Sequence, residues 1–132
     1  MEICGFEIAK KLKEKGFEDN CIGYYDYAGE FHYNYESAIS NKEIYFCHSK
    51  YDNIWHRDLV DTPTISQVLK WLRKKKNIFV VTFIADDSDT PLTYEIYMGT
   101  ECLLTHHGEY FTLQEWDKCN LVGIEYCLDN LI

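Results

Sequence analysis

Apolar residues recur at helical spacing in three segments of the chain, and the first lies close to the N-terminus. Within residues 5–15, Phe6, Ala9 and Leu12 are three residues apart, and lysines occupy the other faces. Gly16 follows, and glycine commonly ends a helix because it adopts the left-handed conformation without strain. The pattern predicts a short amphipathic helix.

The second helical segment, residues 64–76, begins with a capping box. In this motif the Thr64 hydroxyl accepts a free backbone N–H of the first turn, and Gln67 reaches back to the start of the helix. Apolar side chains share a sector of about 100° on the helical wheel. They are Ile65, Val68, Leu69 and Leu72, with Trp71 at the flank. The spacing predicts a helix with one buried face.

The third helical segment closes the chain. Thr112 and Glu115 form a second capping box, and Phe111 and Trp116 occupy the two positions of a hydrophobic staple. Apolar residues then continue at helical intervals. They are Leu113, Trp116, Ile124, Cys127, Leu128 and Leu131. We expect a long helix packed on a sheet.

Strand patterns fill the intervals between these helices. Residues 21–35 contain two aromatic runs around an Ala-Gly dipeptide, which is typical of a β-hairpin. Residues 78–85, IFVVTFIA, are β-branched and aromatic, which predicts a strand covered on both faces or central in its sheet. After a turn at residues 86–91, the chain returns as a strand over residues 92–98. One face of that strand is apolar and comprises Leu92, Tyr94, Ile96 and Met98.

Residues 36–61 mix polar positions with one short strand pattern at Ile44–Cys47 and also contain His48, Trp55 and His56. We interpret this stretch as a long loop. Loops of this length inside a compact domain are uncommon, so the stretch is either functional or contains an unrecognised element.

The predicted order is α-β-β-α-β-β-α. It indicates a two-layer α+β fold with one antiparallel sheet of about four strands and three helices. With 132 residues, of which 46% are hydrophobic, the chain can fill a core without disulfides. We expect residues 1–132 to form a single domain.

The net charge of -9 is unevenly distributed. Residues 1–85 contain 12 acidic and 12 basic residues, whereas residues 86–132 contain 10 acidic residues and a single basic one, Lys118. An acidic surface repels nucleic acid and anionic membranes and favours a basic protein partner.

Residues 1–15 lack the apolar run of a signal peptide, and charges interrupt every other apolar stretch before it reaches the length of a membrane span. We therefore expect a cytoplasmic protein with no membrane partner. In that compartment cysteines stay reduced, and most of them are expected to be buried as small apolar side chains. The six are Cys4, Cys21, Cys47, Cys102, Cys119 and Cys127.

The basic run at the end of the second helix raises an alternative function, nucleic-acid binding. The residues concerned are Lys70, Arg73, Lys74, Lys75 and Lys76, with neighbouring tyrosines as stacking platforms. Four consecutive residues spread around the whole helix, however, and cannot form one basic stripe. Cations at a helix C-terminus also complement its dipole. We interpret the run as a helix end in solvent, and we do not expect a nucleic-acid partner.

A second alternative is a Cys/His metal site or a thiol enzyme. The nearest groupings are Cys47-His48 and Cys102 with His106-His107, and neither has the spacing of a zinc motif. No cysteine is marked by its neighbours as an activated thiolate. The acids Asp86, Asp87 and Asp89 lack the glycine and distal glutamate of an EF-hand and are interpreted as a hydrated turn.

The chain resembles a family of small uncharacterised proteins of Bacteroides-type gut bacteria and of their phages and prophages. The similar residues are Lys11–Phe17, Cys21, Tyr24, Tyr25, Pro63, Thr64, Gln67, Lys70–Arg73, Gly123, Ile124, Cys127, Leu128 and Leu131. The most specific element is the string P-T-x-x-Q-x-x-K-W-L-R, while residues 36–61 and 99–108 lie outside the resemblance. The resemblance implies a small cytoplasmic accessory protein linked to phages. It implies no activity, cofactor or catalytic residue.

These observations favour a non-catalytic protein-binding module. The charge asymmetry points to the acidic last third, together with residues 36–61, as the surface that engages a host or phage protein. We expect the protein not to be an enzyme and to have no catalytic, cofactor-binding or metal-binding residues.

Overall fold

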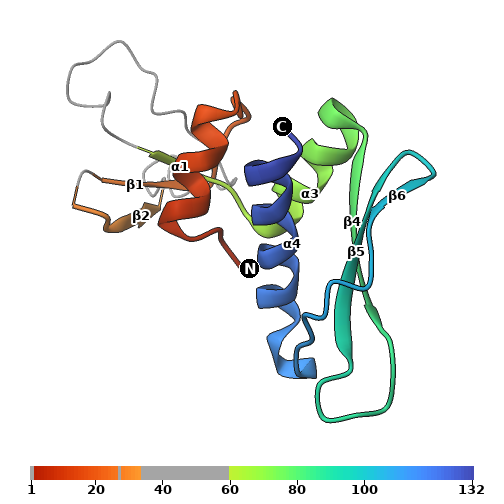
Figure 1. Ribbon diagram of the computed structural model, residues 1–132. Helices are drawn as coiled ribbons and strands as arrows, with labels where there is room; N and C mark the ends of the chain where they lie inside the picture. The colour runs from red at the N-terminus through yellow and green to blue at the C-terminus, as the bar shows by residue number, and fades with distance from the viewer. Residues whose placement is uncertain (1, 27, 34–59) are drawn as a thin grey trace. The chain divides into compact units, whose positions relative to one another are not determined.

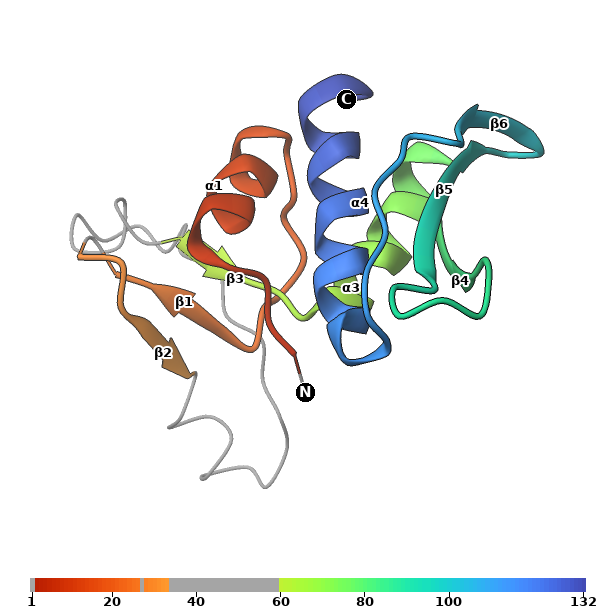
Figure 2. The ribbon, with the colours of Figure 1, turned by 60° about the horizontal axis from the view of Figure 1, so that its bottom comes forward.

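The structure is a computed structural model that describes residues 2–26, 28–33 and 60–132. The chain forms two compact units, residues 1–64 and residues 65–132, and each is described by itself (Figures 1 and 2). Both units combine helix with antiparallel sheet, so the predicted α+β class is confirmed. No helix in the described ranges has both the length and the apolar character needed to cross a bilayer.

The first unit contains helix α1 (Phe6–Glu14) and a three-stranded antiparallel sheet in the order β2-β1-β3. The strands are β1 (Gly23–Tyr25), β2 (Phe31–Tyr33) and β3 (Val60–Thr62). The predicted helix ends where expected, with Gly16 at φ 88°. Strands β1 and β2 are the predicted hairpin.

The interior of the first unit lies where α1 packs against β3. Ala9 and Leu12 of the helix are fully buried, as the helical spacing predicts. The Tyr25 hydroxyl of β1 donates a hydrogen bond of 3.1 Å to the carbonyl oxygen of Cys4, which precedes the helix. Tyr25 also packs edge-to-face on Phe6, with ring centroids 5.3 Å apart. These contacts join the start of α1 to the sheet.

The second unit begins with helix α3 (Ile65–Trp71), which starts directly after Thr64 as predicted and continues as a π-helical turn, η2 (Leu72–Lys76). Asn77 ends it in the left-handed conformation with φ 57°. The sheet that follows has the antiparallel order β4-β5-β6. Its strands are β4 (Ile78–Ile84), β5 (Leu92–Met98) and β6 (Glu101–Leu104). A 3-10 turn, η3 (Leu113–Glu115), leads into helix α4 (Trp116–Asn130).

Helix α4 packs on one face of this sheet, against β4 and β5 (Figures 1 and 2). Val80 lies against Gly123 of the helix, and the Thr82 hydroxyl donates a 2.7 Å hydrogen bond to Asn120 Oδ1. Because side chains alternate between the faces of a strand, the even-numbered residues of β4 face α4. Buried side chains from both layers fill the core between them. They are Ile78, Leu92, Tyr94, Ile96, Ile124, Cys127 and Leu128.

Several sequence expectations are wrong. The described residues form two three-stranded sheets rather than one of about four strands, and β3 and β6 were not expected because they are short and lack a clear alternating pattern. Among the residues that the structure describes, 78–84 form an edge strand rather than a central one. The pattern misled because an all-apolar strand normally has both faces covered, whereas Val81 is 41% exposed.

The helices also differ from prediction in which side chains they bury. Trp71 of α3 is buried, while Leu69, expected in the core, is only partly so. Leu113 and Trp116 are exposed rather than packed on the sheet, because the first turn after Thr112 is a 3-10 turn that changes the direction of its side chains. The strand pattern at Ile44–Cys47 lies outside the described residues.

Candidate functional site

One end of the second unit brings together the turn between β4 and β5 and the start of α4 (Figures 1 and 2). Ile84, the last residue of β4, pairs with Leu92, the first of β5. Leu92 in turn forms two backbone hydrogen bonds with Phe111, of 3.0 and 2.8 Å. Phe111 immediately precedes the capping residue Thr112, so the start of α4 is fixed next to the end of the sheet.

This end of the unit exposes large apolar side chains. Ile84 is 60% exposed, Leu113 51%, Tyr110 47% and Trp116 43%. Two of the four are aromatic residues of the types that most often dominate binding energy at protein interfaces. We call these four residues, together with the exposed acids beside them, the acidic–apolar end. The acids are Asp86, Asp87, Asp89, Glu109 and Asp117.

The acidic turn of this end has a defined local structure. Asp86 Oδ1 accepts hydrogen bonds from the Ser88 hydroxyl, at 2.6 Å, and from the Ser88 backbone N–H, at 3.0 Å. These two bonds lower the pKa of Asp86 from its ordinary value. Asp86 therefore stays ionised through the physiological range, beside the exposed Asp87 and Asp89.

The start of α4 is held by the predicted capping box of Thr112 and Glu115, which is confirmed. The backbone N–H of Thr112 donates a 2.9 Å hydrogen bond to Glu115 Oε1, and Lys118 Nζ lies 3.3 Å from Glu115 Oε2. The cap fixes the backbone on either side of Leu113, which is itself exposed. The apolar side chains beside the turn are therefore presented by an ordered helix end.

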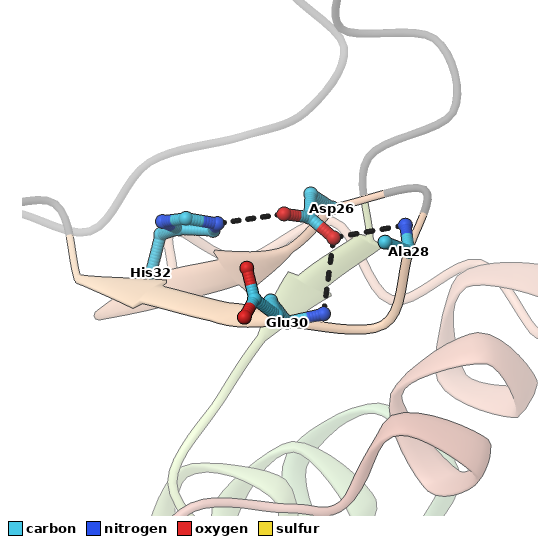
Figure 3. Close-up of polar contacts among 4 residues, drawn as sticks. All are labelled: Asp26, Ala28, Glu30 and His32. Atoms are coloured by element: carbon cyan, nitrogen blue, oxygen red, sulfur yellow. Dashed lines mark hydrogen bonds and ion pairs between the residues drawn. The ribbon is translucent and has the colours of Figure 1, made fainter.

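A second cluster of polar side chains lies at the turn between β1 and β2 (Figure 3). Asp26, Glu30 and His32 each place a possible ligand atom within 4.8 Å of the other two, and they are the one such group of three among residues 2–26, 28–33 and 60–132. Carboxylate and imidazole groups are the donor types that a zinc ion accepts. Their geometry must therefore be compared with a cation site.

Both carboxylate oxygens of Asp26 already accept hydrogen bonds within the hairpin (Figure 3). Oδ1 accepts the backbone N–H of Ala28 at 2.9 Å and that of Glu30 at 3.0 Å. His32 Nε2 lies 2.7 Å from Oδ2. The bonds from His32, Glu30 and Ala28 lower the pKa of Asp26. A metal would have to break the contact with His32, so we assign this cluster to fixing the turn.

The basic run ends the helical segment in solvent, as predicted. Arg73, Lys74 and Lys75 are exposed, and Lys76 Nζ lies 5.6 Å from the centre of the Trp71 ring. The side chains belong to a π-helical turn followed at once by Asn77 and β4. The hairpin tyrosines that were considered as stacking platforms belong to the first unit, and the basic run belongs to the second.

The Cys/His groupings named from the sequence do not make a three-ligand site in the described part of the chain. Cys102 is exposed, and its thiol lies 3.6 Å from the Leu104 carbonyl oxygen. His107 stacks on Tyr94 at 4.1 Å between ring centroids, and its Nε2 lies 2.7 Å from the Tyr94 carbonyl oxygen. His107 thus covers the edge of β5 beyond the end of β6. Cys47, His48 and His56 lie outside the described residues.

No disulfide joins the described cysteines to one another, and all but Cys102 are buried. Burial raises the pKa of Cys4 and of Cys127 to about 12. The pKa of Cys119 is also raised by burial. A nucleophilic thiol needs the opposite shift, so these three behave as small core side chains.

Sequence reasoning missed the Asp26 cluster and the apolar part of the acidic–apolar end, but it recognised the acidic charge of that end. Glu30 lies four positions after Asp26 in the sequence, and His32 two positions after Glu30. The three side chains come together only because this part of the chain forms a hairpin. Leu113 and Trp116 of the acidic–apolar end were expected to pack on the sheet because their helical spacing is the same as that of buried positions. No protein-family model, curated protein or solved structure matches this chain.

Proposed function

We propose that this chain is a small non-catalytic accessory protein of the cytoplasm that binds a protein partner through the acidic–apolar end of its second unit. The observation that carries the proposal is the exposure of Ile84, Leu113, Tyr110 and Trp116 beside the acidic turn. A phage-linked role agrees with the resemblance noted in the sequence and remains a proposal.

The apolar part of the surface supplies the binding energy in this proposal. Trp and Tyr side chains offer large contact areas at a low cost in conformational entropy. Scattered apolar residues are normal on protein surfaces, but four large exposed side chains at one end of a small unit support the proposal of an interaction site there.

The charges define the chemistry of the partner. Asp86, Asp87 and Asp89 lie beside the exposed Ile84, so a matching segment carries Lys or Arg next to an apolar strip. A basic amphipathic segment of a protein fits this description. An anionic surface repels nucleic acid, and so the alternative of nucleic-acid binding would have to use Lys70 and Arg73–Lys76 on their own.

A charge-reversal experiment tests the proposal. The triple variant Asp86→Lys, Asp87→Lys, Asp89→Lys and the single variant Trp116→Ala should each lose the proteins that the wild-type chain captures from host lysate. A triple variant in the first unit, Glu14→Lys, Glu18→Lys, Asp19→Lys, makes the same charge change at exposed positions and should retain them. Tyr33→Ala is the matched aromatic control, because Tyr33 is exposed in the first unit.

Calorimetry with a synthetic amphipathic Lys/Leu helix, beside a Glu/Leu peptide of the same length, measures the interaction directly. The basic peptide should bind with an affinity that falls as salt is raised, because exposed charges are screened. Equal binding of the acidic peptide, or capture that none of the variants alters, would contradict the proposal. A mobility shift of single-stranded nucleic acid at low salt, abolished by reversing Arg73–Lys76, would establish the alternative instead.

A further inference from the structure

Strand β4 forms one edge of the second sheet, and among the described residues no strand pairs with its outer side. Its seven residues, IFVVTFI, include no proline and no charge. Proteins usually protect an edge with charged residues, proline, a bulge or a short strand. The opposite edge of this sheet follows that practice, since β6 has four residues, starts with Glu101, and pairs with β5 across a bulge. The edge of β4 has none of these protections.

The backbone of β4 shows which groups point to the open side. At one end the Gly99 N–H donates to the Asn77 carbonyl oxygen at 3.0 Å, and at the other the Ala85 N–H donates to the Pro91 carbonyl oxygen at 2.8 Å. Hydrogen-bonded pairs alternate along an antiparallel ladder, so odd-numbered residues bond to β5. The N–H and C=O groups of Val80, Thr82 and Ile84 therefore point away from β5, toward the open edge.

The sequence of β4 is nearly the same in both directions, because IFVVTFI reversed is IFTVVFI. If two copies of the strand pair antiparallel about a two-fold axis at Val81, Ile78 meets Ile84, Phe79 meets Phe83 and Val80 meets Thr82. Valine and threonine have nearly the same shape. This register pairs even-numbered residues with even-numbered residues, so the outward N–H and C=O groups of the two copies face one another.

Charges at the two ends of β4 fit the same arrangement. The exposed basic residues Arg73, Lys74 and Lys75 precede the strand, and the exposed acids Asp86, Asp87 and Asp89 follow it. In an antiparallel pair, the start of one strand lies beside the end of the other. The basic helix end of each copy would thus lie beside the acidic turn of its partner, at both ends of the pair. This complementarity offsets the repulsion between two chains of net charge -9.

We propose that β4 of a second copy of this chain pairs with β4 of the first, edge to edge about a two-fold axis at Val81. The β4-β5-β6 sheets of the two copies then form one antiparallel sheet of six strands. Both α4 helices then lie on the same face of that sheet, since paired residues share a face. Phe79, Val81 and Phe83 of both copies form a continuous apolar band on the other face.

The oligomeric state of the full chain tests this pairing. Sedimentation velocity should show a dimer of the wild type that dissociates on dilution. Val81→Lys places two like charges opposite one another and should weaken dimerisation about tenfold or more. Met98→Lys is the matched control, because the exposed fraction of Met98, 40%, is close to the 41% of Val81. Met98 lies on β5, however, away from the open edge. Met98→Lys should leave the dimer intact.

A charge-swap experiment makes the assignment specific. Val81→Glu alone should be monomeric, like Val81→Lys, whereas an equimolar mixture of the two variants should form a dimer, because Lys and Glu then meet at the two-fold axis. A wild type that is monomeric at every soluble concentration would overturn the proposal. So would a Val81→Lys variant as dimeric as Met98→Lys, or a mixture that stays monomeric.

A second set of variants tests the end charges without touching the core of the sheet, and two single variants separate this inference from the proposed partner site. Reversing Asp86, Asp87 and Asp89 should weaken the dimer, and reversing Arg73, Lys74 and Lys75 in the same chain should restore it, because the end charges again have opposite signs. Trp116→Ala should abolish partner binding but leave dimerisation intact. Val81→Lys should weaken dimerisation but leave partner binding intact. If neither charge reversal changes the strength of dimerisation, the proposed antiparallel register is contradicted.

Discussion

Gly123 of α4 lies so close to Val80 of β4 that a Cβ atom at position 123 would be 2.6 Å from Val80 Cγ1. The same atom would be 3.3 Å from Cδ2 of Tyr94 on β5. The helix therefore approaches the sheet through its bare backbone at this one turn. The core of the second unit depends on this close approach.

Gly123→Ala should destabilise the protein, although alanine is intrinsically favoured in a helix by about 1 kcal/mol. The added methyl group must push the helix away from Val80 and Tyr94, and overpacking of this kind costs about 1–3 kcal/mol. Chemical denaturation measures the change. Gly5→Ala is the control, because no atom lies within 4 Å of a Cβ at Gly5 and its φ is -70°. A Gly123→Ala variant at least as stable as wild type would contradict the close packing.

The bond from Thr82 Oγ1 to Asn120 Oδ1 predicts a second stability effect. Thr82→Val keeps the shape of the side chain but leaves the amide oxygen of buried Asn120 without this donor, which should cost about 1–3 kcal/mol. Thr82→Ser retains the hydroxyl and should restore most of that stability. Equal unfolding midpoints for the valine and serine variants would show that the bond contributes nothing.

The capping box at the start of α4 predicts a pH dependence. The pKa of Glu115 is lowered by the N–H of Thr112, by the Thr112 hydroxyl and by Lys118. A lowered folded-state pKa stabilises the fold above the ordinary pKa of a glutamate, and that stabilisation is lost as the pH falls through the lowered value. Wild type should therefore exceed Glu115→Gln in unfolding free energy at neutral pH, and the two should converge in acid. A difference that persists or grows in acid would contradict this assignment.

The hairpin turn predicts a measurable titration shift at Asp26. His32, Glu30 and Ala28 together lower the pKa of Asp26, and carboxyl-carbon NMR should place it below its ordinary value. His32→Ala removes the largest of these contributions and should raise the pKa toward that value. If zinc instead raises the melting temperature of wild type but not of Asp26→Asn, the cluster is a cation site rather than a set of hydrogen bonds that fixes the turn.

Thiol labelling distinguishes exposed from buried cysteines. Cys102 is exposed and should be the fastest of the described cysteines to react with a thiol reagent in the native protein. Cys4, Cys119 and Cys127 should react only on unfolding, because burial limits access and raises their pKa. Peptide mapping by mass spectrometry identifies each labelled site, and Cys102→Ser is the control. Rapid native labelling of Cys127 would contradict its place in the core.

The elements with strong local signals could be predicted from the sequence. The three helix starts, the hairpin and the two long strands follow from caps, turn residues and periodicity, which are properties of neighbouring residues. Strands β3 and β6 could not be predicted, since these short strands have neither the turn signal of the β1–β2 hairpin nor a clear alternation and are defined by their pairing partners. The edge position of β4 is likewise a property of the sheet.

The candidate site was predictable only in its charges. The acidic turn at Asp86, Asp87 and Asp89 was recognised from the sequence, as was the basic helix end. The exposure of Trp116 and Leu113 was not, because spacing alone does not distinguish an apolar residue in a core from one at a binding surface. The approach of His32 to Asp26 depends on the hairpin register.

The composition of β4 has a consequence before folding is complete. A seven-residue segment of β-branched and aromatic residues without charge or proline is typical of sequences that stack into amyloid fibrils. In a parallel in-register stack, Arg73–Lys76 would align with itself in every chain, and so would the acids at 86–89, so like charges would repel along the whole fibril. The two charged stretches therefore act as gatekeepers that disfavour fibril growth while the sheet is still unformed.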